Sequence, residues 1–138
     1  MRVLVLCTGN SARSQMAEGI LRRLGHGTIE VHSAGTHPSH VNPFAIEAMN
    51  EIGIDISSHR SKSVDKFTQQ HFDLVITVCD KAKESCPIFP GAPERIHWSY
   101  EDPAVVEGSH DEKLAAFRRV RDDLWQRFKD LLASHVAS

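Results

Sequence analysis

The sequence predicts an α/β fold in which helices cover a mostly parallel sheet. Continuous aliphatic runs at 3–6 and 74–78 are typical of strands that are buried on both faces of such a sheet. Elsewhere the apolar residues recur at helical spacing, so strands and helices alternate along the chain. No repeat, low-complexity tract or linker interrupts the 138 residues, and we therefore expect one domain over 1–138.

The other elements of the first half follow from local signals. A helix is predicted over 13–24, where apolar residues share one face and a Gly-His-Gly follows as a stop. A second strand is expected within 28–35. Asn42 is a candidate N-cap and Pro43 suits the first helical position, so a second helix is predicted to begin there and to end at Gly53.

The second half predicts a short strand and a long helix. Residues 95–99 are a candidate fourth strand. Ser109 and Glu112 have the spacing of a capping box, and an amphipathic run from Leu114 to Leu131 follows them. The chain is therefore expected to close on a long helix.

Composition excludes several classes of binding partner and of cellular location. The net charge of −2 gives no basic footprint, so neither nucleic acid nor an anionic membrane is an expected partner. No apolar run has the length of a signal peptide or a membrane span, and we expect a cytoplasmic protein. In that compartment structural disulfides are rare, so the three cysteines are expected to be buried, metal-bound or reactive.

The segment after the first strand has the features of an anion-binding loop around a thiol. Loop 8–12 joins a strand end to a helix start, where free N–H groups and the positive end of the helix dipole converge on Cys7. Gly9 allows the loop to curl, and the guanidinium of Arg13 suits a tetrahedral oxyanion. Ser14 could donate to the sulfur, which would exist largely as thiolate. This set is chemically complete for nucleophilic attack on a phosphate-like centre.

An alternative is that Cys7 is a small packed residue at a strand end. The strand before it and the helix after it favour the reactive interpretation. The loop is not a nucleotide-binding loop, because the Gly-Lys-Ser/Thr ending is missing.

The segments CTGNSARSQMAEG, SAGTHP, VCDKAKESCPIFPG and WSYEDPA resemble the thioredoxin-coupled arsenate reductases, which are built on the low-molecular-weight protein tyrosine phosphatase fold. The resemblance covers nearly the whole chain and implies a three-layer sandwich with a four-stranded parallel sheet flanked by helices. It implies that Cys7 attacks arsenate, that Arg13 binds the arsenate oxygens and that Asp102 is the general acid. The implied substrate-binding residues are Thr8, Gly9, Asn10, Ser11, Ala12, Arg13 and Ser14.

The resemblance also implies a disulfide relay through Cys79 and Cys86 that thioredoxin regenerates. Asp80 is a candidate N-cap for a short helix between the two cysteines. Seven helical residues rise about 10 Å, whereas a disulfide needs Cα atoms within about 7 Å. We therefore expect residues 79–90 to unwind when Cys79 and Cys86 pair. A zinc site and two inert buried thiols are the alternatives for these cysteines.

Several further points stay open at this stage. Asp102 precedes a proline and could simply form a turn. Glu18 and Ser33 match residues that hold the loop in the family, and the ammonium of Lys62 could stand in for a potassium ion that some members bind. We expect no metal, no cofactor and a monomer.

The alternative functions are a low-molecular-weight protein tyrosine phosphatase, with weak phosphatase activity expected in either case, and a thiol redox sensor without turnover.

Overall fold

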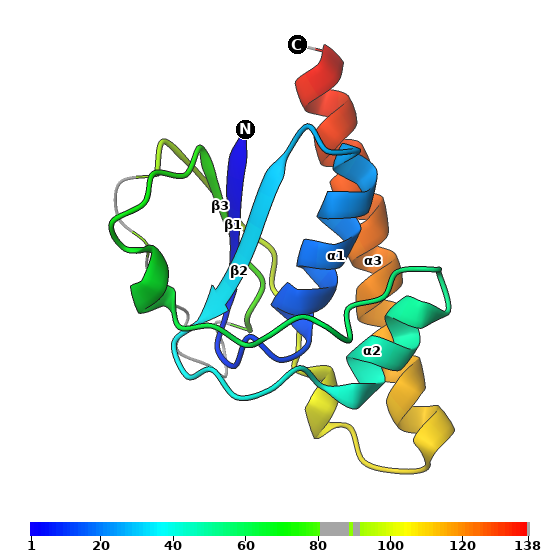
Figure 1. The fold of residues 1–138 in the computed structure, drawn as a ribbon. Coiled ribbons are helices and arrows are strands. Elements are labelled where there is room, and N and C mark those ends of the chain that lie inside the picture. The colour runs from blue at the N-terminus through cyan, green and yellow to red at the C-terminus, as the bar shows by residue number, and fades with distance from the viewer. Residues whose placement is uncertain (81–88, 90–91, 138) are drawn as a thin grey trace.

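The computed structural model describes residues 1–80, 89 and 92–137 and contains a four-stranded sheet with strand order β2-β1-β3-β4. All neighbouring strands are parallel. The strands are β1 (Arg2–Cys7), β2 (Glu30–Gly35), β3 (Leu74–Thr77) and β4 (Glu94–His97). The predicted α/β fold with a parallel sheet is confirmed (Figure 1).

The helices are α1 (Arg13–Gly25), α2 (Pro43–Asn50) and α3 (His110–Ala137), with short 3₁₀ turns η1 (Val64–Phe67) and η2 (Pro103–Val105). Figure 1 shows α1 and α3 side by side along one face of the sheet, with α2 beside them. Helix α2 ends three residues before the predicted stop at Gly53, because residues 51–53 continue as turns. The helix predicted between Cys79 and Cys86 lies outside the described residues.

The predicted helix caps are present. The side chain of Asn42 accepts a hydrogen bond from the backbone N–H of Phe44 at 2.8 Å, ahead of Pro43 at the first helical position. Ser109 Oγ accepts from the N–H of Glu112 at 3.1 Å, and the Glu112 carboxylate accepts from the N–H of Ser109 at 3.4 Å. This reciprocal pair is the capping box that starts α3. Helix α1 ends through a left-handed His26, with φ of 49°, one residue after Gly25.

The side chains of β1 alternate between two apolar cores, as the pleat of a strand requires. Val3, Val5 and Cys7 belong to the larger core beneath α1 and α3, which also includes Met16, Phe117 and Phe128. Leu4 and Leu6 belong to a smaller core on the opposite face, with Phe67, Phe72 and Phe89. Strand β1 is therefore buried on both faces, which explains its continuous aliphatic sequence.

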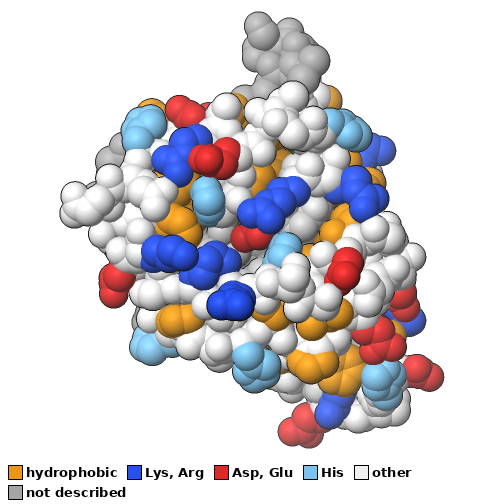
Figure 2. Space-filling view, in the orientation of Figure 1, with side chains coloured by type: hydrophobic (Ala, Val, Ile, Leu, Met, Phe, Trp, Pro, Cys, Tyr) orange, Lys and Arg blue, Asp and Glu red, His pale blue; other side chains and the backbone are white. Residues whose placement is uncertain are grey.

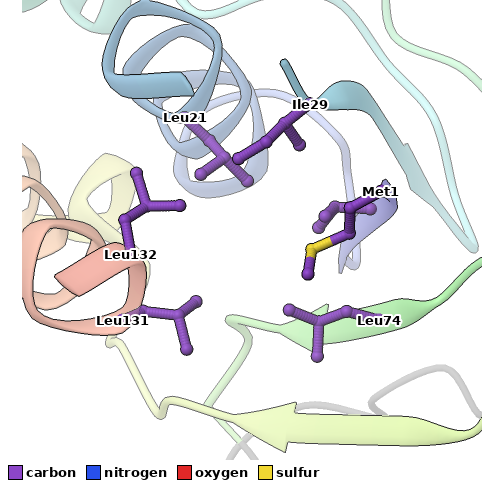
Figure 3. A pocket seen from close by; sticks show the side chains of 7 residues that line it. Met1, Leu21, Ile29, Leu74, Leu131 and Leu132 are labelled. Atoms are coloured by element: carbon purple, nitrogen blue, oxygen red, sulfur yellow. The ribbon is translucent and has the colours of Figure 1, made fainter. Parts of the chain in front are cut away.

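The two ends of the sheet differ in character. The N-terminus and the last turns of α3 lie near the amino ends of the strands (Figure 1). A pocket at this end is lined by apolar side chains from β1, β3, α1 and α3, and Figure 3 shows Met1, Leu21, Leu74, Leu131 and Leu132 around it. It offers no polar group that would hold an anion. Within the described ranges no helix combines the length and hydropathy needed to cross a membrane.

Candidate active site

Cys7 ends β1 at the opposite, carboxyl end of the sheet. It is a free thiol and only 1% exposed. Its Sγ lies 2.8 Å from the hydroxyl oxygen of Ser14, in the first turn of α1. The predicted contact between this serine and the sulfur is therefore present. The sulfur lies where the loop, the strand end and the helix N-terminus meet.

The carbonyl groups of the loop between β1 and α1 accept hydrogen bonds from residues outside the loop. The bonds are His37 N–H to Thr8 O at 2.9 Å, Ser39 N–H to Gly9 O at 3.2 Å, Ser61 Oγ to Asn10 O at 2.6 Å and Asn42 N–H to Ser11 O at 2.9 Å. In a planar trans peptide the N–H points away from the C=O. Because these carbonyls are directed outward, the amides of residues 9–12 are directed to the other side of the loop. Such a row of N–H groups forms an anion-binding concavity.

Asn10 provides the tight bend of the loop, with φ of 46°. Gly9, which was predicted to let the loop curl, does not have a positive φ, so that prediction is wrong. Asn10 tolerates the left-handed conformation because its side chain is fixed by hydrogen bonds. Its Oδ1 accepts from Lys62 N–H at 2.8 Å and from Gln15 Nε2 at 3.0 Å.

The Asn10 amide also links the sulfur to a buried carboxylate. Its Nδ2 donates to Ser14 Oγ at 2.7 Å and to Ser33 Oγ at 3.0 Å, and Ser33 Oγ donates to Glu18 Oε1 at 2.6 Å. Since Ser14 Oγ accepts from Asn10, its own proton is available to the sulfur of Cys7. This directed chain leaves the Ser14 hydroxyl as the donor to the Cys7 sulfur.

Glu18 is 3% exposed and lies among three basic side chains. Arg22 Nη2 lies 3.2 Å from its carboxylate, His59 Nδ1 lies at 3.5 Å and Lys62 Nζ lies at 3.8 Å. Burial lowers the pKa of Lys62 and of His59, although the Glu18 charge acts in the opposite direction on both. Basic side chains gather on the face that carries α1 and the end of β2 (Figure 2). The Lys62 ammonium therefore lies beside the carboxylate of Glu18, and its replacement of a potassium ion stays a prediction.

Gly35, the last residue of β2, lets the loop approach the sheet. A Cβ at this position would lie 2.4 Å from Thr8 O, 2.9 Å from Asn10 N and 3.0 Å from Cys7 O. All of these are backbone atoms, so no side-chain rotation would relieve the overlap. The small residue is required here by the close approach of two backbones.

Arg13 begins α1 and turns its guanidinium toward the segment that precedes η2. Its side chain is 4% exposed, Nη1 donates to Tyr100 O at 3.0 Å, and Nη2 lies 4.0 Å from Asp102 Oδ2. Asp102 Oδ1 accepts from the N–H of Ala104 at 2.9 Å, so this side chain caps a turn, as its alternative interpretation required. It also faces the guanidinium. Glu101 is exposed.

Cys79 follows β3 at the same edge of the sheet. Val78 N–H donates to Leu6 O at 2.9 Å, which places the chain after β3 beside the end of β1. Cys79 is fully buried in the same core as Cys7 and is disulfide-bonded. Cys7 is not its partner, because the Cys7 thiol is free. Cys86 lies outside the described residues.

A family model described as low molecular weight phosphotyrosine protein phosphatase matches residues 2–137. The chain belongs to this family. An arsenate reductase of Halalkalibacterium halodurans is 49% identical over 127 residues, which cover 92% of this chain and 91% of the relative. A solved arsenate reductase in the oxidized state has a TM-score of 0.81 at 36% identity and covers 96% of this chain and 97% of its own.

A thioredoxin-dependent arsenate reductase of Corynebacterium glutamicum is also similar, with a TM-score of 0.70 and 25% identity. It covers 99% of this chain and 63% of its own length. The predicted resemblance to arsenate reductases built on the phosphatase fold is therefore confirmed.

Several residues that hold the loop were not predicted from the sequence. Gln15 Nε2 donates to Asn10 and to Arg60 O, His59 faces Glu18, and Ser61 Oγ donates to Asn10 O. The side chains of His59 and Ser61 come from a segment without regular structure, about fifty residues after the loop in the chain. No periodicity or local motif marks them. Residues 1–80, 89 and 92–137 contain no group of His, Cys, Asp and Glu placed to hold a metal ion.

Proposed function

We propose that this chain reduces arsenate to arsenite, with Cys7 as the nucleophile. The proposal depends above all on the free, buried Cys7 thiol, which contacts Ser14 inside a loop whose carbonyls are directed outward. That arrangement suits a tetrahedral oxyanion next to a thiolate. The relatives described as arsenate reductases support arsenate as that oxyanion.

In the first step arsenate lies in the loop, with its oxygens bound by the amides of 9–12 and by Arg13. The Cys7 thiolate forms a bond to arsenic, and one arsenate oxygen leaves as water after it takes a proton from Asp102. The 4.0 Å distance between Arg13 Nη2 and Asp102 Oδ2 supports these roles for the two side chains. The product of this step is a Cys7–arsenic adduct.

In the second step the Cys79 thiolate attacks the sulfur of Cys7. An S–S bond forms, the S–As bond breaks, and its electron pair stays on arsenic, which leaves as arsenite. Cys86 then attacks Cys79, so that Cys7 is released as thiolate and the disulfide passes to Cys79 and Cys86. A free Cys7 together with an oxidised Cys79 is the combination that follows this transfer.

Thioredoxin is proposed as the reductant that restores Cys79 and Cys86. Its dithiol would take up the disulfide by thiol exchange, as the thioredoxin-dependent relative suggests. Such a relay requires a reducing compartment, so we place the protein in the cytoplasm. One domain over 1–138 carries the whole relay.

Phosphate ester hydrolysis is the second candidate function, because the family is that of the phosphotyrosine phosphatases. A loop that binds arsenate also binds phosphate, since the two anions share shape and charge. The same Cys7 and Asp102 would then cleave an aryl phosphate slowly. Cys79 and Cys86 would have no chemical role in that reaction.

The test is arsenite production by purified protein with thioredoxin, thioredoxin reductase and NADPH. Wild type is expected to complete many turnovers, and Cys86→Ser to stop after the first. Hydrolysis of an aryl phosphate without any arsenite would instead assign the chain to the phosphatases. Stoichiometric binding of arsenate without turnover would indicate a sensor.

A further inference from the structure

The segment between β4 and α3 approaches Arg13 with two groups. The backbone carbonyl of Tyr100 accepts from Nη1 at 3.0 Å, and the carboxylate of Asp102 lies 4.0 Å from Nη2. The guanidinium is almost fully buried, so its plane is set by neighbouring groups and not by water. The position of the Tyr100 backbone therefore influences where the donors of Arg13 point.

The side chain of Tyr100 is attached to α3. Its hydroxyl donates to Asp123 Oδ2 at 2.5 Å, and Arg127 Nε binds the same carboxylate oxygen at 3.1 Å. The Arg127 guanidinium also lies over the Tyr100 ring, 5.3 Å from its centroid. Burial and the Asp123 carboxylate raise the pKa of Tyr100, so its hydroxyl keeps the proton that it donates.

The same segment has a separate anchor two residues earlier. Trp98 N–H donates to Thr77 O at 2.9 Å, and the Trp98 ring packs edge-on against Phe128, with centroids 5.1 Å apart. Loss of the Tyr100 hydroxyl therefore leaves the segment attached to the sheet and to α3. This loss instead allows the Tyr100 carbonyl, and Asp102 two residues later, to move relative to Arg13.

We propose that Tyr100 is a positioning residue for oxyanion binding: Asp123 and Arg127 on α3 hold its side chain, and its carbonyl thereby orients the guanidinium of Arg13. The inference rests on the proposed role of Arg13 in binding a tetrahedral oxyanion. It extends the site beyond the loop to α3, which contributes through Tyr100 and not by touching the anion.

The variant Tyr100→Phe tests this, because it removes the hydroxyl and keeps the ring. The probe is inorganic phosphate, and the measured quantity is the phosphate concentration that half-protects Cys7 from iodoacetamide, read by peptide mass spectrometry. We expect this concentration to rise about threefold to tenfold, the effect of losing one hydrogen bond. Asp123→Ala is expected to cause a similar rise, and the double variant no larger one, because both remove the same anchor.

Asp130→Ala is the matched control. Asp130 lies on α3, and its carboxylate accepts an exposed hydrogen bond from Gln126 Nε2 at 3.0 Å. Its half-protecting concentration is expected to equal that of wild type. All measurements are made well below each variant's melting temperature, so a loss of stability alone does not change them. In arsenate turnover, the KM of Tyr100→Phe is expected to rise more than its kcat falls.

A half-protecting concentration in Tyr100→Phe within about twofold of wild type would overturn the proposal. The proposal would also be overturned if the effects of Tyr100→Phe and Asp123→Ala on the half-protecting concentration added fully in the double variant. Phosphate protection needs no arsenate reduction, so the two proposals fail separately. If wild type made no arsenite but phosphate protected the variants less well than wild type, only the proposed function would be refuted. If phosphate did not protect Cys7 even in wild type, both the proposed function and the role of Tyr100 would be refuted.

Discussion

Replacing Gly35 by alanine is expected to disrupt the anion-binding loop from its back. The added methyl would lie 2.4 Å from Thr8 O, about 1 Å closer than an ordinary contact between such atoms. Because Asn10 N and Cys7 O are also within 3.0 Å, the loop has to move away from β2 as a unit. Such a shift alters the direction of the amides that are proposed to bind the oxyanion.

The expected cost is large for a single methyl group. Overpacking in a well-packed interior costs about 1–3 kcal/mol, and overlap with backbone belongs at the upper end of this range. For a chain of 138 residues, about 3 kcal/mol lowers the melting temperature by roughly 10 °C. The oxyanion affinity is expected to fall by at least about tenfold, because misplaced donors lose much of their hydrogen-bond energy.

Two assays measure these effects. Calorimetry gives the melting temperature, and protection of Cys7 from iodoacetamide gives the phosphate affinity. Gly9→Ala is the matched control for stability, because its added methyl finds its nearest neighbour at 3.6 Å and its melting temperature is expected to stay near that of wild type. If Gly35→Ala melted like wild type and bound phosphate equally well, the close approach of β2 would not position the loop.

Three further predictions concern charge and the sulfur. Hydrogen bonds from Arg118 and Arg121 lower the pKa of Glu51 from 4.5 to about 2, so this pairing stabilises the fold above pH 4.5 and is lost as the pH falls toward 2. Because Glu51 is one-third exposed, Glu51→Gln is expected to lower the free energy of unfolding by only about 1 kcal/mol at neutral pH. Near pH 2 the substitution is expected to have no effect. Urea titrations at the two pH values measure this, and an equal loss at both would contradict it. Lys62→Met leaves Glu18 with Arg22 and His59, so we expect its melting temperature to be a few degrees lower than that of wild type. KCl is expected to raise the melting temperature of this variant more than choline chloride does, whereas the two salts act equally on wild type. If both salts also acted equally on the variant, the Lys62 ammonium would not be a substitute for a potassium ion. Ser14→Ala removes the hydroxyl that lies 2.8 Å from Cys7 Sγ and is expected to slow alkylation of Cys7 at neutral pH by about tenfold, and an unchanged rate would show that this hydrogen bond does not contribute to the reactivity of the sulfur.

The secondary structure could be predicted largely from local sequence. The aliphatic run at 3–6 required burial on both faces, and β1 is indeed covered by a core on each side. The caps at Asn42 and Ser109 could be predicted because each depends on residues within three positions. Element ends were less predictable, since Gly25 and His26 both suit a helix end and only His26 takes the left-handed conformation.

The site could be predicted where it is contiguous in sequence. Cys7, Arg13 and Ser14 fall within one loop and one helical turn, so strand and helix together placed them. The left-handed Asn10 was not predictable, because bonds from Lys62 and Gln15 determine that conformation. The contacts of Glu18 with His59 and of Tyr100 with Asp123 depend on tertiary packing alone.

Arsenite release in a single turnover is the sharpest test of the proposed roles of Cys7 and Cys79. Fully reduced protein is mixed with excess arsenate without any reductant, arsenite is counted per chain, and the disulfide formed is identified by mass spectrometry. We expect about one arsenite per chain for wild type and for Cys86→Ser, and none for Cys7→Ser. In Cys86→Ser we expect the disulfide to join Cys7 and Cys79. Arsenite released by Cys7→Ser, or a Cys86→Ser product without the Cys7–Cys79 disulfide, would contradict these roles.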